Sequence, residues 1–111
     1  MPQKMLVTNY HYSCSTEELE ATLAGLAPEF AQVPGCLWKI TIVDAEQHEA
    51  GGIYLFRDEA SLDAFKASPL VGQVLSHPAL SNFDLKTRDI LREISEATRA
   101  PLGETVMAHS A

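Results

Sequence analysis

Polar and apolar side chains alternate along residues 4–13, a stretch that contains Val, Thr and Tyr. Because side chains of a β-strand point to opposite faces in turn, this period of two predicts a first strand. The period then lengthens to that of an α-helix, with apolar side chains at Leu19, Leu23, Leu26 and Phe30. These positions define one buried stripe along a first helix.

The ends of this helix are indicated by residues with known conformational preferences. Ser15 and Glu18 have the spacing of a capping box, in which each side chain accepts from the backbone N–H of the other. Pro28 has no N–H to donate, so the helix is expected to kink or restart there. Pro34-Gly35 is expected to end the helical stretch.

Two further strands follow, joined by a short polar link. Residues 36–44 read CLWKITIVD and residues 49–57 read EAGGIYLFR, and both carry the β-branched and aromatic side chains that favour strands. Residues 45–48 (AEQH) lie between them. This arrangement predicts a β-hairpin.

The second half of the chain repeats the change from helix to strand. Asp58 is the predicted N-cap of a second helix, which turns Leu62 and Phe65 inward and is interrupted at Ser68-Pro69. The remaining predicted elements are helical turns over residues 70–77, a strand over residues 81–90, a short helix over residues 91–99 and a frayed end from about Pro101.

The predicted order β-α-β-β-α-β is that of a ferredoxin-like α+β fold. Right-handed crossovers then give an antiparallel sheet of order 4-1-3-2 with two helices on one face. The other face still carries apolar residues, and a second copy of the same sheet is its simplest cover, which predicts a twofold dimer. We expect residues 1–111 to form one such domain, with an ordered core over about residues 4–100.

Composition and charge narrow the possible partners. The formal net charge is −7, which disfavours nucleic acid and anionic membranes, because both attract clustered Lys and Arg. No apolar run approaches the roughly 20 residues that span a bilayer, and the first residues turn polar too early for a signal peptide. We therefore expect a cytoplasmic protein. Cys14 and Cys36 are predicted to be free thiols, because they would lie at opposite ends of two parallel strands.

The hairpin carries a family resemblance. It reads PGCLWK over residues 34–39 and HEAGGIYLF over residues 48–56, followed by Asp58-Glu59. These strings resemble the YdhR-type monooxygenases, which belong to the wider group of small antibiotic-biosynthesis-type monooxygenases. The resemblance extends from residue 5 to about residue 102 and includes Glu93, Ser95, Thr98, Ala100 and Pro101. It implies a homodimer of the dimeric α/β-barrel type and a monooxygenase activity.

The same hairpin supplies candidates for substrate binding. If its turn centres near Glu46, Trp38 lies opposite Tyr54. Trp38, Tyr54 and Phe56 then share a face beside Gly52, which predicts an aromatic-walled hollow for a flat ligand. Each candidate has a structural alternative: a core or interface aromatic for Trp38, a solvated hydroxyl for Tyr54, and a bulge or close backbone packing for Gly51-Gly52.

Three further residues, Asn9, His11 and His77, are candidates for catalysis. Asn9 and His11 are two positions apart in the first strand and therefore share a face. Similarity to cofactor-free oxygenases implies that Asn9 holds a substrate oxygen, with His11 or His77 as the base near neutral pH. The alternatives are a solvated Asn9, a surface or interface His11, and a His77 that suits the C-terminal end of a helix electrostatically.

No sequence motif for a flavin, nicotinamide or metal cofactor is present, so an oxygenase of this sequence would take its electrons from the substrate. The sequence therefore predicts a cofactor-independent monooxygenase that acts with O2 on a small aromatic or enolisable hydrophobic compound. Two alternatives stay open. One is a non-catalytic dimer that binds a small apolar metabolite, and the weaker one is a haem-binding or haem-degrading protein that uses His77.

Overall fold

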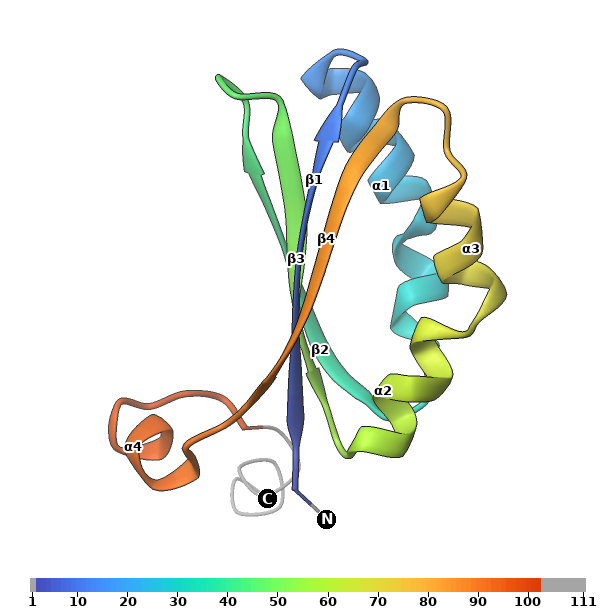
Figure 1. Ribbon diagram of the computed structural model, residues 1–111. Helices are drawn as coiled ribbons and strands as arrows, with labels where there is room; N and C mark the ends of the chain where they lie inside the picture. Colours follow the sequence, from blue (N-terminus) through green and yellow to red (C-terminus); the bar gives the residue numbers. More distant parts are fainter. Residues whose placement is uncertain (1, 103–111) are drawn as a thin grey trace.

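The computed structural model describes residues 2–102 (Figure 1). Its elements, in chain order, are β1 (Lys4–Tyr12), α1 (Thr16–Ala31), β2 (Cys36–Asp44), β3 (Glu49–Phe56), α2 (Glu59–Lys66), α3 (Pro69–Leu75), β4 (Leu80–Asp89) and α4 (Arg92–Ala97). This order confirms the predicted β-α-β-β-α-β pattern. The second helix is divided into α2 and α3, and the short α4 follows the last strand.

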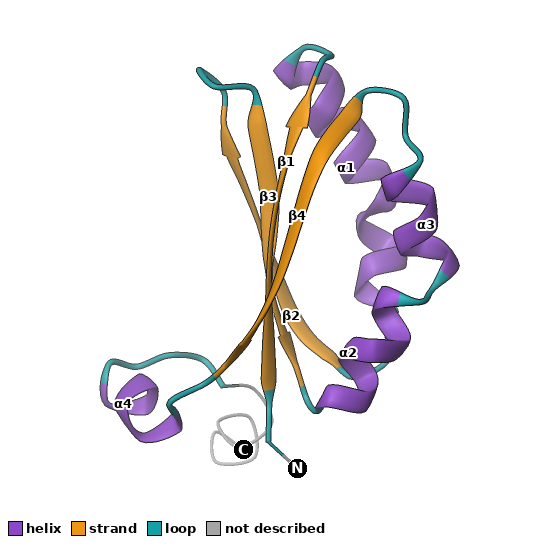
Figure 2. Ribbon diagram, in the orientation of Figure 1, coloured by secondary structure: helices purple, strands orange, loops and turns teal. Residues whose placement is uncertain are grey.

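The four strands form one antiparallel sheet of order β2-β3-β1-β4, which is the predicted order read from the other edge. Helices α1, α2 and α3 cover one side of this sheet, and α4 lies on the other side (Figure 2). We call the covered side the helix face; in β1 it carries Leu6, Tyr10 and Tyr12, which pack with helix residues. The opposite side, with Asn9 and His11, is the open face.

Helix α1 begins as the sequence predicts. Ser15 N–H donates to Glu18 Oε1 at 3.0 Å and Glu18 N–H donates to Ser15 Oγ at 3.1 Å, which completes the capping box. The helix continues through Pro28 to Ala31, so no restart occurs at the proline. Pro28 therefore costs the helix a single backbone hydrogen bond and leaves it continuous.

Helices α2 and α3 are separated by the predicted break. Ser61 N–H donates to the Asp58 carboxylate at 2.8 Å at the start of α2. Ser68 caps α3, in which Pro69 is the first residue and its missing N–H has no consequence. Among the described residues, no helix combines the length and the apolar character required to cross a membrane.

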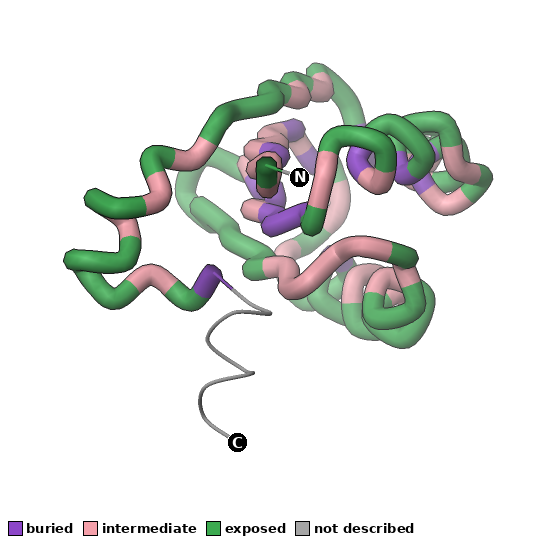
Figure 3. The backbone as a smooth tube through the Cα atoms, turned by 90° about the horizontal axis from the view of Figure 1, so that it is seen from below, coloured by how far each residue is buried: buried purple, intermediate pink, exposed green. Residues whose placement is uncertain are grey.

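The core lies between the helix face and the three covering helices. Its side chains form two clusters, one around Leu6, Phe56 and Leu62 and the other around Tyr12 and Leu19. The buried segments, purple in Figure 3, are concentrated in the central strands β1 and β3. The packing of α1 to α3 on these strands therefore supplies most of the buried apolar surface, the main favourable term in folding.

The register of the hairpin differs from the predicted one. Asp44 pairs with Glu49, so the turn centres between Glu46 and Gln47 rather than near Glu46. A shift of one residue moves every side chain of a strand to the opposite face relative to its partner. The predicted pairs across the hairpin are therefore wrong.

This register separates two of the predicted binding residues. Trp38 pairs with Leu55, and Lys39, rather than Trp38, pairs with Tyr54. Tyr54 and Phe56 lie in the core on the helix face, whereas Trp38 lies on the open face. The prediction that Trp38, Tyr54 and Phe56 share one aromatic face is thus wrong for Trp38.

The segment after α4 packs against Trp38. The indole N–H of Trp38 donates to the carbonyl oxygen of Pro101 at 2.6 Å, and Gln3 Nε2 donates to that of Leu102 at 2.8 Å. Leu102 is only 1% exposed. Trp38 is therefore part of the packing between the sheet and this segment. The end that was predicted to fray from about Pro101 is packed at Pro101 and Leu102, and the rest of it lies outside the described residues.

Cys14 follows β1 at one end of the sheet, and Cys36 begins β2 at the other end. Both are free thiols, as predicted. Free thiols fit a reducing compartment. The cytoplasmic location itself stays a prediction.

The packing at Gly51 gives a test of the fold. A Cβ atom at Gly51 would lie 1.9 Å from the carbonyl oxygen of Thr8, whereas a Cβ at Gly25, inside α1, would meet nothing within 4 Å. We expect Gly51→Ala to lower the free energy of unfolding by about 2–3 kcal/mol, because the paired strands must separate. Gly25→Ala, the control, should raise it by about 0.5–1 kcal/mol. Urea unfolding followed by circular dichroism measures both, and equal stability of the two variants would contradict the strand packing.

Candidate functional site

An apolar cavity of about 40 Å³ lies between the helix face and the helices. We call it the inner cavity; its aromatic and polar lining comprises Thr8, Tyr10, Phe30, Tyr54, Phe65 and Phe83, and the rest is aliphatic. The whole lining comes from three strands and from three helices. The inner cavity therefore exists only once the helices have packed on the sheet.

The hydroxyl groups of Tyr10 and Tyr54 are the unusual feature of this lining. Both side chains are buried, at 6% and 7% exposure, yet neither hydroxyl has a hydrogen-bond partner among residues 2–102. The hydroxyls of Tyr12 and Thr8 do have partners, Thr16 Oγ1 at 2.8 Å and the backbone of Gly52. Because no described side-chain oxygen is both fully buried and unpaired, these two hydroxyl oxygens keep some accessible surface, and each can donate a hydrogen bond to a ligand.

Burial also fixes the protonation state of these tyrosines. It raises the pKa of Tyr10, and it raises the pKa of Tyr54 far above the usual range, to which the proximity of Tyr10 contributes. Both phenols consequently stay neutral at physiological pH. A neutral phenol can donate a hydrogen bond to an oxyanion, which is one of the roles predicted for Tyr54.

Lys39 lies beside the aromatic wall of the inner cavity. Its Nζ is 4.2 Å from the ring centroid of Phe30 and 5.3 Å from that of Tyr54, and it donates to Thr41 Oγ1 at 3.1 Å. A Cβ at Gly52 would lie 3.0 Å from Lys39 Cε and from the Tyr54 ring. The space above Gly52 is therefore filled by these two side chains, which supports close packing rather than a ligand hollow at this glycine.

A larger groove runs over the helices next to the inner cavity. Its volume is about 960 Å³, and its walls include Pro28 and Val33 from the end of the α1 region and Ala64 and Leu70 from α2 and α3. Phe65 is the one described residue that lines both the groove and the inner cavity. The groove is within the size range of small-molecule sites, whereas the inner cavity is smaller than an aromatic ring requires. Phe65 therefore separates a large space from a small one.

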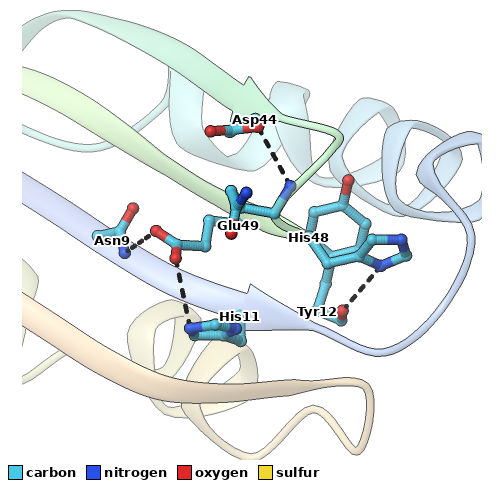
Figure 4. A network of polar contacts seen from close by, with 7 residues as sticks. Asn9, His11, Tyr12, Asp44, His48 and Glu49 are labelled. Atoms are coloured by element: carbon cyan, nitrogen blue, oxygen red, sulfur yellow. Dashed lines mark hydrogen bonds and ion pairs between the residues drawn. The ribbon is translucent and has the colours of Figure 1, made fainter.

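Two of the predicted catalytic residues lie on the open face, next to a carboxylate (Figure 4). Asn9 Nδ2 donates to Glu49 Oε1 at 3.1 Å, and His11 Nε2 is 3.5 Å from Glu49 Oε2. The adjacent His48 turns away and stacks on Tyr12, with the ring centroids 4.8 Å apart. Asn9, His11 and Glu49 thus form one polar cluster, separated by the sheet from the inner cavity.

The third predicted catalytic residue, His77, is in neither place. It follows α3, and its Nδ1 accepts a hydrogen bond from Ala79 N–H at 3.1 Å, which stabilises the turn into β4. It does not line the inner cavity. Across residues 2–102, His, Cys, Asp and Glu side chains form no group of three or more able to hold a metal ion. The structure therefore does not bring Asn9, His11 and His77 together into one site.

Sequence reasoning missed several residues of the inner cavity. Tyr10 alternates with Asn9 and His11, so its placement on the opposite face follows from the strand period alone. Lys39, which lies beside the cavity wall without lining the cavity, was missed because of the hairpin register. The meeting of Phe30 with Phe65 depends on the packing of α1 against α2.

The fold and the cavity together define a ferredoxin-like α+β protein with an aromatic-lined cavity beneath its helices. The chain belongs to the family described as "Putative mono-oxygenase ydhR", whose sequence model matches residues 5–101. This match confirms the predicted resemblance and covers nearly the same range, from residue 5 to residue 101. No curated protein shows significant similarity to the chain.

Solved structures share this fold. Protein SO0527 from Shewanella oneidensis is 21% identical, with a TM-score of 0.68 over 80% of this chain and 91% of that one. NE2512 from Nitrosomonas europaea, described as of unknown function, is 18% identical, with a TM-score of 0.71 over 82% and 91% of the two chains. SnoaB from Streptomyces nogalater, described as a cofactor-independent oxygenase, is 18% identical, with a TM-score of 0.65 over 83% and 99%. At these identities the likeness establishes the fold.

The position of Phe65 gives a test of the site. Phe65→Ala should join the inner cavity to the groove and increase the binding of N-phenyl-1-naphthylamine, a neutral fluorescent probe, several-fold. Leu62→Ala is the matched control, because Leu62 is buried in the same helix and lines neither space. Both variants should lose about 2–5 kcal/mol of stability. Equal probe fluorescence in the two variants would contradict the separation of the two spaces by Phe65.

Proposed function

We propose that this protein is a cofactor-independent monooxygenase that acts on a small aromatic or enolisable hydrophobic compound in the inner cavity. The observation that carries the proposal is the pair of Tyr10 and Tyr54 hydroxyls, which belong to buried residues of an otherwise apolar cavity lining and have no hydrogen-bond partner among residues 2–102, although their oxygens keep some accessible surface. Family membership and the description of SnoaB, which shares the fold, support the same reaction class. The proposed substrate site is the inner cavity extended toward the groove by movement of Phe65.

The reaction that suits this site needs an electron-rich substrate. A phenol or enol that loses its proton gives an anion, which can transfer an electron to O2 and then form a carbon-bound hydroperoxide. Loss of water from the hydroperoxide leaves a carbonyl, so that one CH2 group and one O2 give one C=O group and one H2O. The substrate supplies all four electrons that reduce O2, and the protein supplies binding, desolvation and stabilisation of charge.

Tyr10 and Tyr54 are the proposed donors to the anionic oxygen of the substrate. Their raised pKa values keep them protonated while the substrate is ionised. The apolar side chains around them, among them Phe83 and Phe30, exclude water, so each hydrogen bond is worth more than it would be in solvent. Phe56 packs behind this site, with its ring centroid 6.1 Å from that of Tyr54, and holds the Tyr54 ring in place.

Oxygen uptake with a panel of hydroquinones and anthrols tests the reaction. We expect uptake above the spontaneous rate with the wild-type protein. Tyr54→Phe should lower kcat about a hundredfold, because it removes one donor to the oxyanion. Tyr12→Phe is the control, since that hydroxyl is bound to Thr16 outside the cavity, and it should retain wild-type activity.

Two outcomes would contradict this proposal. The first is the absence of uptake across the whole panel, and binding of panel compounds without uptake would then favour a non-catalytic binding protein. The second is an equal loss of activity in Tyr54→Phe and Tyr12→Phe, which would place the chemistry elsewhere.

We also propose that the protein is a homodimer formed through the open face. Ile40 and Ile42 of β2 are 51% and 41% exposed there. The same face carries Asp84 and Lys86, which form an ion pair at 3.4 Å, so charges of both signs are available for contact with an identical surface. An exposed apolar patch of this kind on a sheet needs a cover, and a second copy provides one by twofold symmetry.

Two exposed residues of β2 on opposite faces test the dimer. Ile40→Glu should weaken dimerisation at least about a hundredfold in sedimentation velocity, because it places a carboxylate in the interface. Val43→Glu is the matched control, since Val43 is 52% exposed but pairs with Ala50 on the helix face. A wild-type protein that stays monomeric at high micromolar concentration, or equal effects of the two substitutions, would overturn the dimer through the open face.

A further inference from the structure

We propose that Lys39 is a substrate-binding residue that selects compounds able to enter the site as phenolate or enolate anions. This inference rests on the proposed function and narrows its substrate class. The known features of the site, two neutral hydroxyls and apolar walls, would accept a neutral aromatic compound as well. A cation at the edge of the same site is what would favour the ionised form.

The first argument is the position of the ammonium group. Lys39 Nζ lies over the rings of Phe30 and Tyr54, at 4.2 and 5.3 Å from their centroids. Both rings are walls of the inner cavity, whose lining does not include Lys39 itself. The ammonium would therefore reach a bound ligand past the edges of these rings, a movement that the flexible four-carbon stem of lysine allows.

The second argument is the lack of a carboxylate at Lys39. Among residues 2–102, Lys39 takes part in no ion pair, whereas Lys4 contacts Asp89 and Lys86 contacts Asp84. The contacts of the Lys39 ammonium are instead two aromatic rings and a threonine hydroxyl. A partly buried cation is stabilised by an anionic partner, so a bound phenolate would supply what the protein itself does not.

The third argument is the electrostatic coupling of the surrounding groups. Burial lowers the pKa of Lys39, and it raises the pKa of its titratable neighbours Cys36 and Tyr54. From α1 the Phe30 ring lies 4.2 Å from the ammonium. Binding of an anion would offset the effect of burial on Lys39, because the phenolate oxygen and the ammonium would form an ion pair.

The experiment compares two small probes. 4-Nitrophenol changes colour when it ionises, whereas nitrobenzene has nearly the same shape and cannot ionise. The wild-type protein should bind the phenolate about tenfold more tightly than the phenol, so bound 4-nitrophenol should ionise about one pH unit below the free compound. Lys39→Met, which keeps the length of the stem, should abolish this shift and change nitrobenzene binding less than twofold.

Two further variants control the comparison. Lys39→Arg keeps the positive charge and should retain most of the shift. Lys86→Met removes an exposed lysine on the open face and should behave as the wild type. Thermal unfolding of each variant establishes that it is folded before its spectra are compared.

The outcomes separate this inference from the proposed function. Nitrobenzene binding with an unchanged phenolate shift in Lys39→Met would overturn the role of Lys39 and leave the cavity as a site. Failure of both probes to bind the wild type would overturn the site and the role of Lys39 together. A shift that depends on Lys39 without oxygen uptake by any ionisable compound would uphold the role of Lys39 and overturn the monooxygenase reaction.

Discussion

The pairing of β3 with its two neighbours is the constraint on which the rest of the molecule depends. Because side chains alternate along a strand, the pairing of Asp44 with Glu49 decides that Lys39 and Tyr54 meet on the helix face while Trp38 points to the open face. Gly51 holds this register on the other edge of β3, since no side chain fits between it and the Thr8 carbonyl. The inner cavity, the lysine over its aromatic wall and the apolar open face all follow from this one alignment.

Most of the fold could be predicted from the sequence because its signals are local. The capping box of Ser15 and Glu18 and the break at Ser68-Pro69 each act within one helical turn, and the structure shows both where they were predicted. The hairpin register could not be fixed in this way. The sequence of a polar four-residue link does not define which residues form the centre of the turn. An error of one residue in that centre moves all side chains of one strand to the opposite face relative to its partner. Helix α1 also continues past Pro28, although proline alone predicts a kink or a restart.

The candidate site was harder to predict, because its residues come from elements that meet only in the folded chain. The sequence points first to Asn9 and His11, whose side chains have obvious chemistry, and the structure places them with Glu49 in a polar cluster on the open face. Tyr10, which lies between them in the sequence, faces the other way into the cavity. A strand with chemistry on both faces offers two sites, and only the packing of Phe30 and Phe65 over one face shows which of them can exclude water.

The two faces of the sheet therefore suit different tasks. On the open face the polar groups of the cluster contact one another, as in the contacts of Glu49 with Asn9 and His11. On the helix face the opposite holds, because one desolvated region contains two hydroxyl donors without partners and an ammonium without a carboxylate. Desolvation raises the pKa values of Tyr10 and Tyr54 and lowers that of Lys39, so it disfavours the charged form of each of these groups. An anionic oxygen is the ligand that suits all three at once, since it accepts from both hydroxyls and pairs with the ammonium. An enzyme whose substrate must donate electrons to O2 needs that oxygen ionised, and a site that favours the anion over the neutral compound lowers the barrier to the first step.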